Sequence, residues 1–232
     1  MTLAASIDKL TETVLSSVEI RKVRDPKKIR DALTGTFVLE EHEINVLDLP
    51  IVQRLRRIGQ TALAFLTYPC ATHNRFQHTL GVTNIITKMA SALRSRKKYK
   101  ALIDDDDLRE LRIAALLHDI GHGPFSHASE EILEHIPEMK DELLTNPKFS
   151  KVQTKPHEIL SYYIVMSKSF RQVIKEINDL YALNINVERI ANMIVGDMDD
   201  PDREEYLSDF LNGAFDADKL DYMPRDAYFS RS

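Results

Sequence analysis

The chain has 232 residues, of which 43% are hydrophobic and 29% charged, with one cysteine and no tryptophan. This length allows one domain with a substantial core or two closely packed ones, and the composition excludes a disordered or fibrous protein. The formal net charge of −5 gives no overall attraction to nucleic acid or anionic membranes. A phosphate-binding site must therefore gather its positive charge locally, and nucleic acid binding is left open.

Cysteine usage and hydropathy indicate the compartment. A single cysteine, Cys70, excludes an intrachain disulfide framework and suits a reducing cytosol. The first residues include several charges and lack the apolar run of a signal peptide, and no stretch approaches the roughly 20 apolar residues that span a bilayer. We therefore expect a cytoplasmic protein with no membrane partner.

Hydrophobic periodicity predicts helices along most of the chain. Apolar residues at helical spacing begin with an amphipathic segment at residues 6–20. Gly35 precedes the β-favouring run Thr36–Leu39, so a small hairpin is expected within residues 17–42. Pro224 is expected to kink or end the last helix. Further helices are predicted, in chain order, at residues 78–93, 108–117, 129–135, 156–168, 169–180, 186–195, 203–212 and 216–227.

These elements predict an all-α fold with a minor β element. We expect an N-terminal helix and β element in residues 1–45 and a helical domain in residues 46–232. Four consecutive aspartates, Asp104–Asp107, precede one predicted helix and could bind a cation. The favoured interpretation is that they cap this helix and complement its dipole.

A dense group of histidines surrounds one acidic residue in the segment HDIGHGPFSH, residues 118–127. The apolar run before it places His118 and Asp119 at the end of a buried helix. A buried carboxylate beside an imidazole is costly unless each is paired or bound to a cation. Such ligands suit Mn, Fe, Ni or Zn, although a His-Asp pair also arises by chance.

Two ligands do not complete a metal site, so other helices must contribute. His78 and Asp218 are candidates, but spacing alone does not select Asp218. His122 and His127 follow in a loop and are expected near the metal but not on it. The remaining histidines outside these segments, His42, His73 and His135, are interpreted as structural or solvent-facing, with His73 a bystander of the site.

Three segments together resemble the HD-domain phosphohydrolases, most strongly the deoxynucleoside triphosphate (dNTP) triphosphohydrolase branch. They are THNRFQHTLGV at 72–82, LLHDIGHGPFSH at 116–127 and DADKLDYMPRD at 216–226, with LDLPIVQRLRRIGQ at 47–60 also similar. The resemblance covers roughly residues 20–228, loosely over 137–215. It implies an all-α HD-domain bundle around one divalent metal held by His78, His118, Asp119 and Asp218.

The resemblance also implies a reaction, in which a dNTP is hydrolysed at its α-phosphorus to a deoxynucleoside and triphosphate. It assigns water activation, leaving-group protonation or phosphate binding to His122, His127 and His157. It further implies phosphate contacts by Arg75 and Lys219, and sugar contacts by Gln60, Tyr222 and Asp226. The metal would be Mn, Fe, Ni, Zn or Mg, with Mg²⁺ accompanying the nucleotide phosphates, and a homo-oligomer is expected.

Simpler interpretations exist for the last helix. Asp218, Tyr222 and Asp226 recur every four residues, so one helix face presents all three. Without the resemblance, Tyr222 would be an ordinary packing residue and Asp226 an ion-pair partner of Arg225.

The sequence also departs from the branch. Thr61 stands where leucine is usual, which weakens the expected discrimination against ribose. Glu130 would orient His127 through a longer arm than usual. The family core normally continues past the closing aspartate, so we expect a partial or shortened member with lowered activity. The alternatives are a nucleotide phosphomonoesterase or phosphodiesterase, or a nucleotide-sensing module without turnover.

Overall fold

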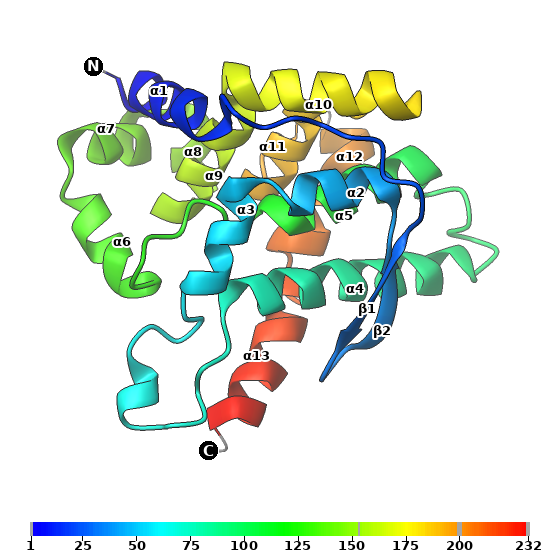
Figure 1. The fold of residues 1–232 in the computed structure, drawn as a ribbon, viewed down its shortest axis with the longest axis horizontal. Helices are drawn as coiled ribbons and strands as arrows, with labels where there is room; N and C mark the ends of the chain where they lie inside the picture. The colour runs from blue at the N-terminus through cyan, green and yellow to red at the C-terminus, as the bar shows by residue number, and fades with distance from the viewer. Residues whose placement is uncertain (1, 153, 199–200, 231–232) are drawn as a thin grey trace.

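The computed structural model describes residues 2–152, 154–198 and 201–230, with the backbone alone for residues 201–203 and 205. Helices dominate this part of the chain (Figure 1). The elements are α1 (Leu3–Leu15), β1 (Lys27–Asp31), β2 (Gly35–Leu39), α2 (Glu41–Leu47), α3 (Pro50–Gln53), the 3₁₀ turns η1 (Arg54–Arg57) and η2 (Ala64–Leu66), α4 (Arg75–Arg94), α5 (Asp105–Leu117), α6 (His127–Glu134), α7 (Pro137–Thr145), α8 (Pro147–Ser150), α9 (Pro156–Met166), α10 (Lys168–Tyr181), α11 (Val187–Val195), α12 (Pro201–Asn212) and α13 (Ala217–Ser230).

The predicted minor β element is confirmed as an antiparallel hairpin. Strands β1 and β2 pair from Lys27 opposite Leu39 to Asp31 opposite Gly35. Gly35 has a φ of 86°, a left-handed conformation that glycine adopts without steric cost. The Asp31 carboxylate closes the turn by accepting hydrogen bonds from the backbone N–H groups that follow it.

The predicted all-α class is confirmed, and local capping explains where helix boundaries differ from expectation. Helix α4 begins before residue 78 because Asn74 and Gln77 form a capping box. Asp104 accepts a hydrogen bond from the Asp107 N–H, and Asp107 accepts one from the Asp104 N–H, at 2.8 and 2.9 Å. The aspartate run therefore caps α5, as the favoured interpretation predicted.

Other boundaries were not foreseen. Helix α1 ends at Leu15 rather than near residue 20, and helices α2, α7 and α8 were not predicted. Pro224 lies inside α13 without ending it. Its ring removes one backbone donor, but the proline and Leu220 one turn earlier are both exposed, so water can hydrate the free carbonyl.

The core lies between the helices that carry the site. Helix α4 packs against α5 and α13, and α11 packs against α9 and α5 (Figure 1). Residues of α1 and β2, including Ile7 and Phe37, join the same buried cluster as Leu111 of α5. The division at residue 45 remains a prediction, and the last two residues of the expected second domain lie outside the described part. None of the described helices is long and apolar enough to cross a membrane.

A buried ion pair ties the hairpin to this core. Arg112 of α5 donates to both Glu43 carboxylate oxygens, at 2.5 and 2.6 Å, and to the Val38 carbonyl of β2 at 2.7 Å. The side chains are 9% and 1% exposed. Loss of one partner would leave the other charge buried and unpaired.

We therefore expect Glu43→Gln to lower the free energy of unfolding by on the order of 3 kcal/mol, because the Arg112 guanidinium loses its compensating charge. Urea denaturation of the metal-free protein measures this change. A loss below about 1 kcal/mol would show that the pair contributes little more than a surface ion pair.

Candidate metal centre and active site

The turn after α5 carries the His-Asp pair and is locked against α9. The Ser161 hydroxyl of α9 donates to the His118 carbonyl at 2.7 Å and accepts from the Gly121 N–H at 2.9 Å. Gly121 approaches α9 so closely that an added Cβ would lie 2.1 Å from the His157 carbonyl oxygen. This contact brings the beginning of α9, with His157, beside Asp119.

Arg54 holds the same turn from the other side. Its guanidinium donates to the Ile120 carbonyl at 2.5 Å and to the His122 carbonyl at 2.9 Å. Burial lowers the pKa of this side chain. Arg54 is therefore a positioning residue, and it lies within the N-terminal segment that carried the resemblance.

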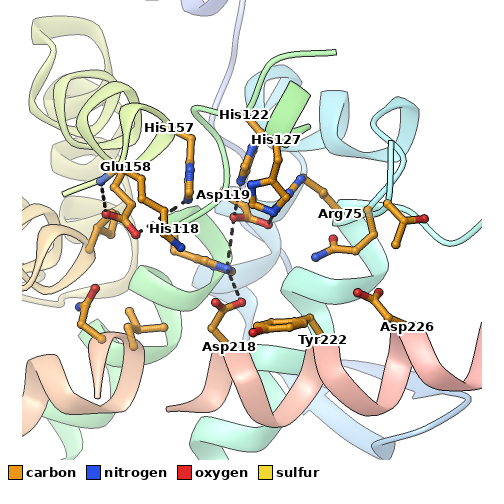
Figure 2. Close-up of a pocket in the computed structure, with 16 residues that line it drawn as sticks. Arg75, His118, Asp119, His122, His127, His157, Glu158, Asp218, Tyr222 and Asp226 are labelled. Carbon is orange, nitrogen blue, oxygen red and sulfur yellow. Dashed lines mark hydrogen bonds and ion pairs between the residues drawn. The ribbon is translucent and has the colours of Figure 1, made fainter. Parts of the chain in front are cut away.

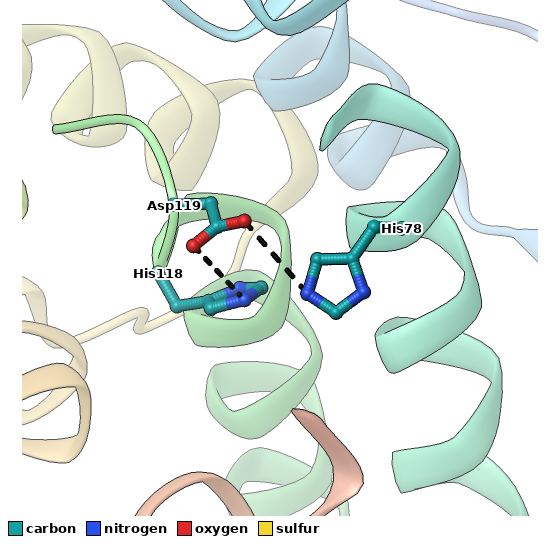
Figure 3. A group of neighbouring side chains, drawn as sticks. All are labelled: His78, His118 and Asp119. Carbon is teal, nitrogen blue, oxygen red and sulfur yellow. Dashed lines mark ion pairs between the residues drawn. The ribbon is translucent and has the colours of Figure 1, made fainter. Parts of the chain in front are cut away.

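The four predicted metal ligands meet at one point. His78 Nε2 of α4 lies 2.8 Å from Asp218 Oδ1 of α13 and 3.7 Å from Asp119 Oδ2. His118 Nε2 lies 3.5 Å from Asp119 Oδ1 and 3.8 Å from Asp218 Oδ1. Figure 3 shows how both imidazole rings face the Asp119 carboxylate. Their arrangement is that of a metal-binding group, although their role as ligands remains a prediction.

The chemistry of these donors fits a divalent metal. His118 Nδ1 lies 2.8 Å from the Ala115 carbonyl, which can only accept, so the neutral ring presents an Nε2 lone pair to the cluster. His78 Nδ1 is likewise 2.8 Å from an Asp221 oxygen. Both Nε2 atoms are buried, and His118 Nε2 forms no hydrogen bond to any described residue. His78 Nε2 has only a carboxylate oxygen, that of Asp218, beside it. Two buried ring nitrogens facing two carboxylates suit a cation.

Electrostatics point in the same direction. Burial alone would lower the pKa of His78, but the carboxylates of Asp218 and Asp221 raise this pKa to about 10. The pKa of His118 is also raised, against burial, by Asp119. Although burial opposes ionisation of Asp119, Arg75 and the nearby histidines hold its pKa well below the usual range. The metal-free cluster thus keeps an anionic Asp119 carboxylate and a protonated His78 imidazole, and a metal would replace that proton.

Three further histidines lie beside this cluster, as the resemblance implied. The rings of His122 and His157 stack with centroids 3.8 Å apart, and that of His127 meets His122 edge-on at 5.3 Å (Figure 2). Glu130 contacts His157 Nδ1 and lies 3.2 Å from His127 Nδ1. The longer arm of this glutamate therefore serves two histidines. Burial lowers the pKa of His122 to about 3, so its imidazole is neutral.

Arg75 connects the two clusters. It donates to Asp119 Oδ2 at 2.6 Å and to the Ser126 hydroxyl, which in turn donates to the Gln60 carbonyl at 3.1 Å. Ser126 has a φ of 53°, which is strained for a non-glycine residue. Its contacts hold Arg75 over the metal centre, and neither the strain nor this role was apparent from the sequence.

The far end of the site holds the predicted sugar contacts. Gln60, Thr61, Tyr222 and Asp226 line the same cavity as Asp119. Among the described residues, Gln60 Oε1 and Thr61 Oγ1 are buried and form no hydrogen bond, so both are available to a ligand.

The environment of Asp226 corrects two sequence interpretations. Its Oδ1 lies 2.6 Å from Nε2 of His73, whose side chain is fully buried and stacks on Phe229. His73 is therefore not a bystander but orients a cavity-lining carboxylate. Arg225 does not pair with Asp226, because its guanidinium binds Asp221 and Asp31 instead.

The cavity measures about 250 Å³ and includes all predicted site residues except His78 and Lys219 (Figure 2). Lys219 instead pairs with Asp216 and lines an adjoining cavity of about 460 Å³. Lys155 and Glu158 border both cavities. They flank His157 in the sequence, so the segment KPHE could have identified them.

Comparisons with known proteins agree with this arrangement. The HD domain family profile matches residues 75–223. An uncharacterized protein of Methanocaldococcus jannaschii is 32% identical over 202 residues, covering 87% of this chain and 34% of that protein. The human deoxynucleoside triphosphate triphosphohydrolase SAMHD1 is 29% identical over 236 residues, covering 95% of this chain and 36% of that protein. This chain thus spans about a third of either relative.

A solved structure, a phosphohydrolase from Bacteroides thetaiotaomicron, has 27% sequence identity and a TM-score of 0.66, covering 89% of this chain and 43% of that one. In this chain a helical bundle likewise brings buried histidines and carboxylates together around a cavity, in a group that could hold a metal ion. The chain belongs to the HD domain family, since the matched region covers more than half of it. The predicted family is thereby confirmed, and HD domains bind divalent metals.

We expect Asp119→Ala or His118→Ala to abolish stoichiometric metal binding, because neighbouring groups cannot replace a ligand at the centre of the cluster. Metal analysis of the purified variants after loading with Mn²⁺ measures this loss. His135→Ala, at an exposed histidine outside the cavity, is the matched control and should bind metal like the wild type. Full occupancy in either ligand variant would place the metal elsewhere.

Metal affinity should rise with pH. The pKa of His78 is raised to about 10 in the metal-free protein, so at neutral pH a metal displaces a proton from this ring. Each displaced proton should weaken the affinity about tenfold per pH unit on acidification. Chelator competition between about pH 6 and about pH 8 measures the slope, and a flat profile would contradict protonation of the metal-free cluster.

Proposed function

We propose that this HD-domain protein hydrolyses dNTPs to a deoxynucleoside and triphosphate. The observation that carries the proposal is the face of α13, which presents Asp218, Tyr222 and Asp226 in sequence along one cavity (Figure 2). One end of this face lies at the metal cluster and the other at Gln60 and Thr61. The similarity to human SAMHD1, a deoxynucleoside triphosphate triphosphohydrolase, supports the same substrate class.

The phosphates would lie at the cationic part of the cavity. Arg75 stands over Asp119, and the exposed Lys155 borders the cavity near His157. Lys219 would reach the phosphates from the adjoining cavity if it exchanged its Asp216 partner for them. These three cations provide locally the positive charge that the acidic chain lacks as a whole.

Two of the three histidines beside the metal cluster would have different roles in the reaction. His122 is neutral and buried, so it can form hydrogen bonds to a phosphate or a water molecule but cannot act as the resting acid. His127 is 63% exposed and held by Glu130, which suits it to protonate the leaving 5′-oxygen. Glu130 stays ionised because contacts with His127 and His157 lower its pKa despite burial.

The metal would be held by His78, His118, Asp119 and Asp218, with Mn, Fe, Ni, Zn or Mg as candidates. When bound, it supplies a Lewis acid that polarises a phosphoryl oxygen and lowers the pKa of water. A separate metal ion, Mg²⁺, would accompany the nucleotide phosphates.

Thr61 favours a second candidate substrate class, the ribonucleotides. Thr61 lines the cavity, and its buried hydroxyl, which has no partner among the described residues, would form a hydrogen bond with a 2′-hydroxyl placed beside it. A leucine there would remove that bond and present an apolar surface to the sugar.

The test is a nucleotide panel with product identification. Mn²⁺-loaded protein incubated with each dNTP should release deoxynucleoside and triphosphate in equal amounts, and His127→Ala should lower kcat about 100-fold or more. Release of orthophosphate alone would indicate a phosphomonoesterase. Tight dNTP binding without turnover, unchanged in His122→Ala, would indicate a nucleotide sensor.

Sugar discrimination provides a separate prediction. Thr61→Leu should raise the ratio of kcat/KM for dNTPs over ribonucleotides by about tenfold, because one hydrogen bond available to the 2′-hydroxyl is lost. Thr61→Ser, which keeps the hydroxyl, is the matched control and should leave the ratio near its original value. An unchanged ratio in both variants would remove Thr61 from the sugar site.

A further inference from the structure

A buried series of charged groups connects the metal cluster to the hairpin. It begins at Nδ1 of His78, the ring nitrogen that faces away from the metal, which lies 2.8 Å from Asp221 Oδ2. Arg225 donates to both Asp221 oxygens, at 2.7 and 2.8 Å, and to both Asp31 oxygens, at 2.9 and 3.1 Å. None of these four side chains is more than 9% exposed.

The hairpin end of this series is itself fixed. Asp31 Oδ2 accepts from the Thr34 N–H at 2.7 Å and from the Thr34 hydroxyl at 2.9 Å. The Thr34 carbonyl then accepts from Asn84 at 2.9 Å and from Lys88 at 2.5 Å. Both donors belong to α4, the helix that carries His78, and the hairpin lies alongside that helix in Figure 1.

Helix α4 leaves space for these groups at Gly81, nearly one turn after His78. A Cβ at this position would lie 1.9 Å from Asp221 Oδ1 and 2.4 Å from Arg225 Nη2. The arrangement therefore depends on a glycine in the middle of a helix, where glycine is otherwise unfavourable.

Stability alone does not account for so many buried charges. Removing charges from water is costly, and well-packed apolar side chains of similar volume often stabilise a core equally well. What the charges add is a fixed orientation of the groups that they contact. A carboxylate bonded to the outer nitrogen of a metal-binding histidine fixes its tautomer and orientation and increases its basicity. One bidentate contact from the Arg225 guanidinium fixes that carboxylate in turn, and a second fixes the guanidinium on Asp31.

We propose that Asp221, Arg225 and Asp31 are positioning residues for His78, so that the hairpin is the outer support of the metal centre. Asp221 holds the His78 ring with Nε2 toward Asp119 and Asp218. Arg225 transmits the position of Asp31 to Asp221. The inference rests on the proposed metal site but is independent of the substrate.

The test measures Mn²⁺ affinity by chelator competition, together with urea denaturation of each metal-free variant. Asp221→Asn should bind Mn²⁺ about 10- to 100-fold more weakly than the wild type. Asp31→Asn, two contacts further away, should weaken binding by a smaller factor. Glu43→Gln is the matched control because the Glu43–Arg112 pair also ties the hairpin to the core but does not touch His78. Its Mn²⁺ affinity should equal that of the wild type even though it is less stable.

Wild-type affinity in Asp221→Asn, or an equal loss in Glu43→Gln, would overturn the proposal. If Asp221→Asn does not fold, Asp31→Asn decides, and wild-type affinity in that variant would overturn it. If the wild type binds Mn²⁺ but releases no triphosphate from dNTPs, the proposed substrate is refuted. The Mn²⁺ affinities of the variants would then still test the role of Asp221, Arg225 and Asp31. Absence of Mn²⁺ binding by the wild type would overturn both the metal centre and its outer support.

Discussion

Asp119 is an almost fully buried carboxylate at the wall of the cavity, and much of the architecture compensates for its burial. It is 2% exposed and remains ionised because Arg75, His118 and His122 surround it. An isolated charge in this position would cost several kcal/mol. The compensating groups come from α4 and from the turn after α5, so the site exists only when these two elements pack against each other. Folding of the core and assembly of the site are therefore one process.

The two ends of the site differ chemically because α13 crosses α4 beside this carboxylate and runs along the cavity. Side chains four residues apart on one helix lie about 6 Å apart along its axis, so Asp218, Tyr222 and Asp226 form a graded wall. The proposed function would place the metal at the Asp218 end of this wall and the uncharged part of the substrate at the Asp226 end. His122, His127 and His157 lie opposite this wall, on segments that follow Asp119 in the chain (Figure 2).

Local sequence patterns predicted the helical class, the hairpin and the burial of the His-Asp pair, because these depend on periodicity, capping and turn residues. Asp218 could be named only through the resemblance, since its approach to His78 is a tertiary contact between distant helices. His73 was misjudged for a similar reason: its partner Asp226 lies far along the chain. The strain at Ser126 and the dual contact of Glu130 likewise depend on how loops close, which periodicity does not encode.

Gly121 has a consequence for how such a site can diversify. Because no side chain fits between this residue and α9, the spacing between Asp119 and His157 cannot be adjusted by substituting larger or smaller residues there. The distance between these two side chains therefore tolerates little variation. The loop that follows Thr61 is the opposite, because Leu63, Leu66 and Tyr68 are exposed and their replacement requires little repacking. Sequence changes are thus tolerated more readily beside Thr61 than at the turn that holds Asp119 against α9.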